Sequence, residues 1–502
     1  MMLNSVDFSG RPFHFIGIGG IGMSALAYVL TQRKLPVSGS DLSLNHITQR
    51  LQDQGAHIFW SQVADNLKIF CPTGVISGDG SSAANIAISS DTISSECSLP
   101  QVICSTAIHP ANPEYRAALE MGCPIFHRSE LLAALMQQYK GIAIAGTHGK
   151  TTTSSMIGYL LLKAGLDPTI IVGGEVNAWE GNAVVGESEY LVAEADESDG
   201  SLVRLAAEIG IVTNIELDHP DHYATLDEVI DTFQTFARQC KTLIGCIDCP
   251  TVRESLQPTI TYSLNQATGA DYTVDRVVYS ATGISARIWE KGAPLGQIEL
   301  RLLGRHNLSN ALAAIATGRR LGLSFETIAE ILATFEGARR RFEHRGEHNQ
   351  ILFIDDYAHH PSEIEVTLAA ARLRAQMTTP PRRVVAVFQP HRYSRTQTFM
   401  AEFGQAFKDA DLVVITDIYS AGEPNVENLT GQQVADTIAA NHPQVIYQPT
   451  LQSTAAYLME TLLAGDLAIF LGAGNLNRVI PELTAYYQKV DESRVEACVS
   501  PA

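Results

Sequence analysis

One segment in the first third of the chain constrains the fold more than any other. The apolar run at residues 142–145 leads into a glycine-rich turn at 146–149, and Lys150 and three threonines follow at once. Apolar residues at helical spacing then continue to Leu161. A strand, a glycine-rich turn and a helix in this order form a phosphate cradle, because N–H groups of the turn and of the helix N-terminus point at the phosphate oxygens. The segment therefore predicts an α/β fold that binds a nucleoside triphosphate.

The residue types in this turn also predict its chemistry. Lys150 would neutralise the terminal phosphates, and the Thr151 hydroxyl would be a ligand of Mg²⁺. Packing does not explain a Lys-Thr pair at the start of a helix. We therefore favour a loop that binds ATP or GTP over a purely structural turn. The spacing departs from the usual P-loop, because Ile144 stands where that loop has its first glycine. The predicted nucleotide-binding residues of this loop are Gly146, Thr147, His148, Gly149, Lys150, Thr151 and Thr152.

Length and charge limit the class of protein. A chain of 502 residues is expected to form roughly two to four domains, and its 45% hydrophobic and 18% charged residues are typical of a globular protein. The net charge of −19 argues against binding to nucleic acid or to an anionic membrane surface. We see neither a signal-peptide pattern nor an apolar stretch long enough to span a membrane.

The cysteines point to a reducing compartment. All eight are scattered over the chain, apart from a lone CxxC pair, Cys246 and Cys249, for which a structural role is favoured over a metal or redox site. We therefore expect a cytoplasmic protein that is not inserted in a membrane. We further expect either a monomer or a homodimer.

The N-terminal part carries a second glycine-rich turn. A predicted strand at 13–18 runs into the pattern Gly17-x-Gly19-x-x-Gly22, a helical pattern follows, and a second strand ends at Asp41. This context is typical of a Rossmann-like fold and predicts a phosphate-bearing ligand, with Asp41 as an acid for a ribose hydroxyl. The pattern does not identify NAD, and a structural tight turn is the alternative.

A polar stretch follows this block. Residues 61–100 are rich in serine, aspartate, asparagine and glycine, and we expect them to form a loop or an insertion.

Acidic and histidine residues follow two predicted strands in the middle of the chain. The strand at 190–193 runs into Glu194 and an acidic stretch, and the strand at 209–213 runs into a loop that contains His219. Ligands of an open parallel sheet bind at the carboxyl ends of its strands. We therefore expect Glu194 and His219 to reach a metal-bound triphosphate in front of Lys150; a solvated acidic loop is the alternative.

Four apolar runs in the last third of the chain predict another α/β unit. Each run ends in polar residues, and the first two ends are rich in histidine, arginine and tyrosine, which suit the binding of carboxylates or phosphates. The runs are residues 351–354, 384–388, 412–416 and 467–471.

The predicted fold is therefore α/β throughout, in three domains. We expect an N-terminal Rossmann-like domain, a central P-loop-type ATPase domain with a mostly parallel sheet, and a C-terminal Rossmann-like domain. Sites at the strand ends of three such domains are expected to face a cleft between them. The predicted domains are residues 1–137, 138–343 and 344–502.

These motifs resemble those of the Mur ligases, the ATP-dependent amide-forming enzymes of peptidoglycan precursor synthesis. The resemblance covers nearly the whole chain, and the irregular spacing around Lys150 is itself a trait of that family. There are two departures: Leu217 stands where the family usually has proline, and the 61–100 stretch is longer than expected. The matching motifs are residues 17–24, 146–153, 194–199, 213–216, 306–307, 340–342, 356–361 and 389–396.

The resemblance implies a role for each predicted site residue. The first domain would bind the UDP part of a sugar nucleotide, and the implied residues are Gly19, Gly20, Gly22, Ser24, Asp41, Ser105, Thr106 and Asn112. Beyond the Lys150 loop, the ATP site would include His306 and Asn307 near the adenine, Asp356 near the ribose, and Arg340 and Arg341 at the phosphates. Mg²⁺ would be held by Thr151, Glu194 and His219. L-Alanine would be oriented by Tyr357, His359, Arg392 and Arg395.

The resemblance also implies the reaction. ATP would activate the carboxylate of UDP-N-acetylmuramate as an acyl phosphate, which the amine of L-alanine would then attack. Lys150, Mg²⁺ and an arginine would supply positive charge, and His359 would orient the amine or accept its proton. The implied catalytic residues are Lys150, Arg341, His359 and Arg392.

Three other functions are weighed against this one. A ligase of the same family would add a preformed tripeptide to the same sugar nucleotide. The function of an NAD-dependent dehydrogenase would not explain the Lys150 loop. The function of an NTPase switch or motor would not explain the basic strand ends of the third domain.

Overall fold

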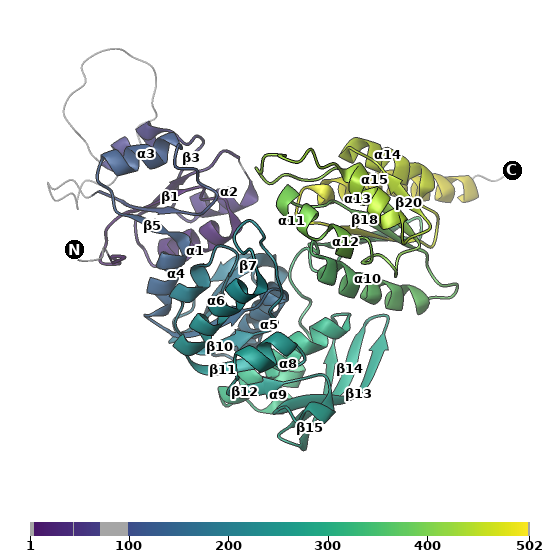
Figure 1. The fold of residues 1–502 in the computed structure, drawn as a ribbon, viewed down its shortest axis with the longest axis horizontal. Helices are drawn as coiled ribbons and strands as arrows, with labels where there is room; N and C mark the ends of the chain where they lie inside the picture. Colours follow the sequence, from purple (N-terminus) through teal and green to yellow (C-terminus); the bar gives the residue numbers. More distant parts are fainter. Residues whose placement is uncertain (1–4, 44, 71–98, 500–502) are drawn as a thin grey trace, which may run out of the picture.

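The computed structural model describes residues 5–43, 45–70 and 99–499, in which three β-sheets succeed one another along the chain (Figure 1). Most of the predicted insertion, residues 71–98, lies outside the described part, and the stretch before it ends in the 3-10 helix η1 (Ala64–Phe70). No helix among the described residues is long and apolar enough to cross a membrane.

The first sheet is entirely parallel, with the strand order β3-β2-β1-β4-β5. Its central strand β1 is buried along its whole length, as expected for a strand of a parallel sheet covered by helices. The first glycine-rich turn joins β1 to α1, at the carboxyl edge of the sheet. The strands are β1 (Phe13–Ile16), β2 (Val37–Ser40), β3 (His57–Phe59), β4 (Gln101–Cys104) and β5 (Ile125–His127), and the helices are α1 (Ile21–Gln32), α2 (His46–Asp53), α3 (Pro113–Glu120) and α4 (Arg128–Met136).

The second sheet has ten strands in the order β15-β14-β13-β12-β11-β10-β6-β9-β7-β8. Six of its nine strand pairs are parallel, so the predicted mostly parallel sheet is confirmed. β6 lies between β10 and β9, and the Lys150 loop follows it directly. The strands are β6 (Lys140–Ala145), β7 (Thr169–Val176), β8 (Gly181–Val184), β9 (Tyr190–Glu194), β10 (Ala207–Val212), β11 (Cys240–Cys246), β12 (Ile260–Tyr262), β13 (Tyr272–Ser280), β14 (Gly283–Glu290) and β15 (Ala293–Leu300).

Helices cover both faces of this sheet. On one face α5 and α8 pack on Ile142 and Ile144 of β6, and on the other Ala143 and Ala145 belong to the core that contains α6, because successive side chains of a strand point to opposite faces. The helices are α5 (Lys150–Lys163), α6 (Leu226–Gln239), α7 (Pro250–Ser255), α8 (Arg305–Arg320) and α9 (Phe325–Leu332), with 3-10 turns η2 (Asn177–Trp179), η3 (Ser201–Arg204) and η4 (Gln266–Thr268).

An antiparallel meander, β13-β14-β15, extends one edge of the second sheet and was not predicted. The strand predictions rest on continuous apolar runs, which mark strands buried on both faces. In β13 every second residue after Asp275 is exposed, and Val278 is 60% exposed, so this strand has one solvent-facing side. Such a strand carries a weaker pattern than a fully buried one.

The third sheet has the order β16-β17-β21-β18-β19-β20, and all its pairs are parallel except β16-β17. With it, the predicted α/β fold with three sheet-containing units is confirmed. The strands are β16 (Glu343–His348), β17 (Ile351–Asp356), β18 (Val384–Phe388), β19 (Leu412–Ile415), β20 (Val445–Tyr447) and β21 (Leu467–Leu471). The helices are α10 (Pro361–Gln376), α11 (Tyr393–Thr398), α12 (Met400–Phe403), α13 (Gly431–Ala439), α14 (Leu451–Thr461) and α15 (Val479–Val499), with the turn η5 (Leu476–Arg478).

The predicted domain boundaries fall at element ends. Residue 137 directly follows α4, and residue 343 is the first residue of β16. The boundaries themselves stay predictions.

The three units are joined in different ways. One continuous apolar core contains residues of the first unit and of the middle unit, and α1 packs against β7 and β8. The third unit has apolar cores of its own on the two faces of its sheet, and Leu217 of the middle unit packs against one of them. Where the middle and third units meet, most of the contacts described below are polar.

The close packing under the Lys150 loop predicts a large effect of Gly146→Ala. The backbone φ of Gly146 is +139°, and an added Cβ would lie 1.9 Å from the Thr213 hydroxyl oxygen. That hydroxyl donates to the His148 carbonyl, so it cannot move away without releasing the loop. We expect a loss of about 2–4 kcal/mol of stability, from backbone strain and overpacking together.

Urea unfolding followed by circular dichroism measures this loss. Gly165→Ala is the matched control, because its φ of +77° carries the strain while nothing lies within 4 Å of the added Cβ. We expect about 1–2 kcal/mol there. Equal losses in the two variants would mean that the loop yields to the extra methyl group.

Candidate active site between the middle and third units

Asp41 is bonded to the glycine loop of the first unit. One of its carboxylate oxygens accepts the Gly19 N–H at 2.8 Å and the other accepts the Ser43 N–H at 3.0 Å. Gly20 ends the turn between β1 and α1, and Gly22 is the second residue of α1. Asp41 thus shapes the loop that is predicted to take the phosphates.

Ser24 lies at the contact between the first and middle units. It is 1% exposed, its hydroxyl donates to the Ile21 carbonyl at 3.0 Å, and it accepts the Asn182 side-chain amide at 2.9 Å. The structure therefore places Ser24 in the first turn of α1, where this helix meets β8.

The predicted segment at 105–112 follows β4, the neighbour of β1. Ser105 is half-buried, Thr106 is exposed, and Ile108 lies against Gly17 of the glycine loop. Asn112 caps α3, because its side-chain oxygen accepts the N–H groups of residues 114 and 115. The segment and the glycine loop are therefore neighbours at the carboxyl edge of the first sheet.

Lys150 at the start of α5 is paired with Glu197. Its ammonium lies 2.8 Å from one oxygen of the Glu197 carboxylate and donates to the carbonyls of Gly146 and Thr147 at 2.7 and 3.1 Å. Burial opposes the charge of Lys150, but nearby carboxylates, Glu197 foremost, outweigh it and raise the pKa of Lys150 to about 12. Burial also raises the pKa of Glu197 to about 7, against the pull of Lys150. Sequence reasoning did not single out Glu197 within the acidic run.

Two of the predicted metal ligands meet at the end of β9. The Thr151 hydroxyl lies 3.1 Å from the Glu194 carboxylate, whose other oxygen accepts the Gly173 N–H at 2.8 Å. His219 has a φ of +54°, and its Nε2 lies 3.8 Å from Glu197. A hydroxyl, a carboxylate and an imidazole beside a phosphate loop fit Mg²⁺, with the imidazole as the less usual ligand.

Arg395 connects the third unit to the middle one. This guanidinium is 2% exposed and donates to the Asp218 carboxylate at 2.9 Å. It also lies 3.2 Å from His391 Nδ1 and 3.5 Å from His219 Nδ1. Burial opposes ionisation of Asp218, but Arg395 and neighbouring histidines hold the pKa of this carboxyl far below its usual range. A buried ion pair thus joins the strand ends of two units.

Other predicted residues of the third unit surround Arg395. Arg392 forms ion pairs with Asp221 of the middle unit at 3.1 Å and with Glu423 at 2.8 Å. The His359 ring lies 5.8 Å from that of His391, which stacks on Tyr419. His391 belongs to the motif at 389–396, but the sequence did not predict it as a site residue.

Asp356, at the end of β17, holds two loops together. Its carboxylate accepts the Phe342 and Ala358 N–H groups, both at 2.7 Å, and burial raises its pKa to about 6. The guanidinium groups of Arg340 and Arg341 lie 4.9 and 5.2 Å from the Tyr357 ring centre. The predicted ribose and phosphate residues therefore form one cluster.

Glu363 links this cluster to the Lys150 loop. Its carboxylate lies 3.2 Å from His359 Nδ1, 3.3 Å from His148 Nδ1 and 3.8 Å from Arg341. Burial opposes ionisation of Glu363, but interactions with His359, His148 and Arg341 lower the pKa of this carboxyl well below its usual value. The histidine–proline start of α10 with a glutamate three residues later is a helix-start pattern, but the sequence did not reveal that this glutamate faces His148.

The start of α8 lies against the same loop. Asn307 donates to the Leu303 carbonyl at 2.7 Å and accepts from Asn310, whose side chain borders Gly149. His306 Nδ1 has no hydrogen-bond partner among the described residues. Burial, followed by Arg341, lowers the pKa of His306 to about 4.

The lowered pKa of His306 predicts a pH dependence of stability. Between pH 4 and the usual histidine pKa of 6.5, the unfolded chain binds a proton at this position that the folded chain does not. The free energy of unfolding is therefore expected to fall as the pH drops from 6.5 to 4. Urea unfolding at several pH values gives the slope of the unfolding free energy against pH. In His306→Asn this slope should be smaller than in the unmodified protein by up to about 1.4 kcal/mol per pH unit. An unchanged slope would show that His306 does not cause the pH dependence. Substitution of the exposed His57 by asparagine is the control and should leave the slope unchanged.

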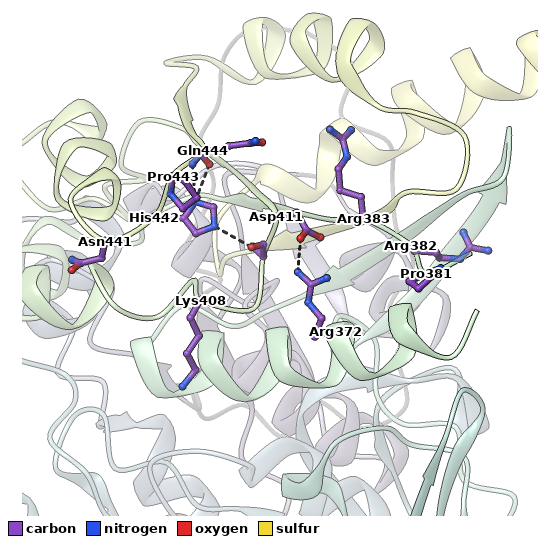
Figure 2. A pocket seen from close by; sticks show the side chains of 11 residues that line it. Arg372, Pro381, Arg382, Arg383, Lys408, Asp411, Asn441, His442, Pro443 and Gln444 are labelled. Atoms are coloured by element: carbon purple, nitrogen blue, oxygen red, sulfur yellow. Dashed lines mark hydrogen bonds and ion pairs between the residues drawn. The ribbon is translucent and has the colours of Figure 1, made fainter. Parts of the chain in front are cut away.

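A shallow hollow of about 790 Å³ lies elsewhere in the third unit (Figure 2). It is lined by residues that precede β18, β19 and β20, at the amino edge of the sheet and therefore opposite the strand ends described above. Its arginines are already paired, Arg372 with Asp411 and Arg383 with Asp466. The hollow is therefore separate from the candidate active site.

Family models cover most of the chain. The Mur ligase family catalytic domain matches residues 12–140, the Mur ligase middle domain matches 144–318, and the Mur ligase glutamate ligase domain matches 340–474. The chain belongs to the Mur ligase family, a family of ATP-dependent ligases, which confirms the resemblance seen in the sequence.

Individual relatives are similar over nearly their whole length. UDP-N-acetylmuramate–L-alanine ligase of Nostoc punctiforme is 68% identical over 486 residues, which cover 97% of this chain and 98% of that protein. The protein of the same name from Gloeothece citriformis is 61% identical, with 96% and 99% covered. Among solved structures, UDP-N-acetylmuramate-alanine ligase MurC from Thermotoga maritima superposes with a TM-score of 0.77 at 26% identity, covering 95% of this chain and 99% of that one.

Proposed function

We propose that this protein joins L-alanine to the carboxylate of UDP-N-acetylmuramate at the expense of ATP. The observation that carries the proposal is the junction itself. There a series of contacts through Glu197 and His219 connects Lys150 to the Asp218–Arg395 pair, and Arg395 in turn contacts His391 of the third unit. The full-length similarity to ligases of that name supports the choice of substrates.

In the first step, the carboxylate of the sugar nucleotide attacks the γ-phosphate of ATP and yields an acyl phosphate and ADP. Lys150 would exchange its contact with Glu197 for the phosphates, and Arg340 and Arg341 would neutralise further charge. Thr151, Glu194 and His219 would hold Mg²⁺, which supplies positive charge at the phosphates when bound. Gly146, Thr147, His148, Gly149 and Thr152 would line the phosphates, and His306, Asn307 and Asp356 the nucleoside.

In the second step, the amine of L-alanine attacks the acyl carbon and expels phosphate. Arg392 and Arg395 would bind the alanine carboxylate, beside Tyr357. Burial lowers the pKa of His359 to about 4, which keeps this imidazole neutral and able to accept a hydrogen bond from the amine. The largely polar contact between the middle and third units supports closure around the acyl phosphate, which must be shielded from water.

In the first unit, Gly19, Gly20, Gly22 and Asp41 would receive the pyrophosphate and ribose, with Ser105, Thr106 and Asn112 beside them. Ser24 would support the loop from its buried position. We further propose a cytoplasmic location and a monomer or homodimer, which light scattering after size-exclusion chromatography distinguishes.

One assay tests the reaction. The protein is incubated with UDP-N-acetylmuramate, ATP and Mg²⁺, and then with L-alanine, glycine, L-serine or the tripeptide. Phosphate release and the mass of the product are measured. We expect release that depends on L-alanine and a product heavier by one alanyl residue. Release with the tripeptide alone would identify the recycling ligase instead, and release without any amine would identify a simple NTPase.

A further inference from the structure

The Glu363 carboxylate lies between the two halves of the candidate active site. Glu363 is the third residue of α10, and its side chain is 12% exposed. One of its oxygens lies 3.3 Å from His148 Nδ1 on the Lys150 loop and 3.8 Å from Arg341. The other accepts the His359 N–H at 3.0 Å and lies 3.2 Å from the Nδ1 atom of that ring. The carboxylate therefore faces the predicted ATP site with one oxygen and the predicted L-alanine site with the other.

The nitrogen of His359 that faces Glu363 carries the ring proton. This Nδ1 lies 2.9 Å from the Tyr357 carbonyl oxygen, which can only accept a hydrogen bond. In the neutral ring the proton is therefore on Nδ1, and Nε2 is left as an acceptor. The Glu363 carboxylate, which also only accepts, favours the same tautomer. Glu363 and the Tyr357 carbonyl thus hold the ring in the form that can accept a hydrogen bond from the amine.

On the other side, His148 is fixed to the Lys150 loop through its backbone. Its N–H donates to the Asn214 side chain at 2.8 Å. Its ring lies between two carboxylates, with Nδ1 facing Glu363 and Nε2 facing Glu216, each at 3.3 Å. Because ionised carboxylates only accept, both nitrogens act as donors and the ring is positively charged. Burial opposes this charge, but Glu216 and Glu363 outweigh it and raise the pKa of His148 to about 10. A movement of the loop therefore moves a charged ring that Glu363 holds.

We propose that Glu363 is a positioning residue that links the Lys150 loop to His359, so that the acyl phosphate forms only when His359 is in place to receive the amine. This role rests on the function proposed above and adds the residue that joins its two steps. The two carboxylate oxygens are a fixed distance apart, so a shift of one contact is passed to the other. Positioning of this kind has a large effect, because a displacement of about 1 Å can lower a rate by about 100-fold.

Loss of this link is expected to let the protein spend ATP without ligation. When His359 is out of place, water attacks the acyl phosphate in place of the amine. This hydrolysis returns the carboxylate of the sugar nucleotide and releases inorganic phosphate. Each such turnover converts ATP and water to ADP and phosphate, so the ratio of ADP formed to product formed rises above one. A merely structural loss of active protein lowers both quantities together and leaves this ratio at one.

The test is Glu363→Gln, assayed with saturating UDP-N-acetylmuramate, ATP, Mg²⁺ and L-alanine. Glutamine can still cap α10 through its side-chain oxygen, so the helix start is retained while the charge is lost. We expect product formation to slow by about 10–100-fold and the ratio of ADP to product to rise to about three or more. A coupled assay measures ADP, and mass spectrometry measures the product. Circular dichroism shows that the variant is folded.

Glu365→Gln is the matched control, because it makes the same change two residues further along α10. Within the described part of the chain, Glu365 forms no ion pair with His148, Arg341 or His359. This variant should leave the ratio at one. His148→Gln removes the loop side of the link and should raise the ratio as Glu363→Gln does. The double variant should be no worse than the more affected single variant, because the two residues act as a unit.

The proposal is overturned if the ratio stays at one in Glu363→Gln, however far the rate falls, or if Glu365→Gln raises it equally. Should Glu363→Gln fail to fold, His148→Gln decides between the same two results. If the unmodified protein forms no product from L-alanine, the proposed function fails and this role fails with it. If the unmodified protein and Glu363→Gln both ligate with a ratio of one, only the role of Glu363 is lost.

Discussion

Replacing Lys150 with methionine is expected to lower the rate of ligation by about 10³-fold or more. The side chains are similar in length, so the change removes chiefly the charge that would meet the γ-phosphate, and phosphoryl transfer depends on such charge. A second effect follows from the pairing of Lys150 with Glu197, which is 1% exposed. Without its partner this carboxyl is buried alone, and the stability is expected to fall by about 3–5 kcal/mol.

A double variant separates the two effects. Lys150→Met combined with Glu197→Gln removes both charges, so most of the lost stability should return. The rate should stay low, since the charge at the phosphates is still absent. Phosphate release under saturating substrates and urea unfolding measure the two quantities. Normal ligation by the folded single variant would contradict the role assigned to Lys150.

Asp218→Asn is expected to open the junction between the middle and third units. Asp218 is 4% exposed, and its removal leaves the Arg395 guanidinium buried without a counter-charge. Breaking one side of such a pair costs about 3–5 kcal/mol. Because the contact there is mainly polar, we expect the loss of free energy to weaken chiefly the packing of the third unit against the middle unit. Small-angle scattering should show a larger radius of gyration, and kcat/KM for L-alanine should fall by about 100-fold.

Asp221→Asn is the matched control for this prediction. It removes a carboxylate of the same loop that pairs with Arg392, but this pair is about one-third exposed on both sides. Exposed pairs contribute about 0–1 kcal/mol, so the shape of the molecule and kcat/KM for alanine should change little. If the two variants behaved alike, the buried pair would not be what holds the units together.

The parts of the site predicted from the sequence are those in which neighbouring residues carry the signal. The turn, Lys150 and Thr151 stand within a few positions, and the apolar run before them and the helical pattern after them set their geometry. The same holds for the strand ends that carry His359 and Arg392. The antiparallel meander β13-β14-β15 escaped prediction because its strands are exposed on one side.

Pairing between distant segments could not be predicted in the same way. Arg395 and Asp218 are 177 positions apart, and the local sequence around either residue does not indicate that the other is its partner. The acidic run after β9 contains several carboxylates, and only the folded chain assigns Glu194 to Thr151 and Glu197 to Lys150.

The amino-acid sequence alone was enough to predict the three α/β units, the glycine-rich turn between β6 and α5, and the family, because these depend on local patterns of apolar, glycine and charged residues. The tertiary structure decided which charges face one another across the junction. It also decided that Ser24 supports a domain contact and that Glu363 lies between His148 and His359. The physical reason is that electrostatic contacts depend on distances of a few ångströms between side chains, which folding sets and local sequence does not.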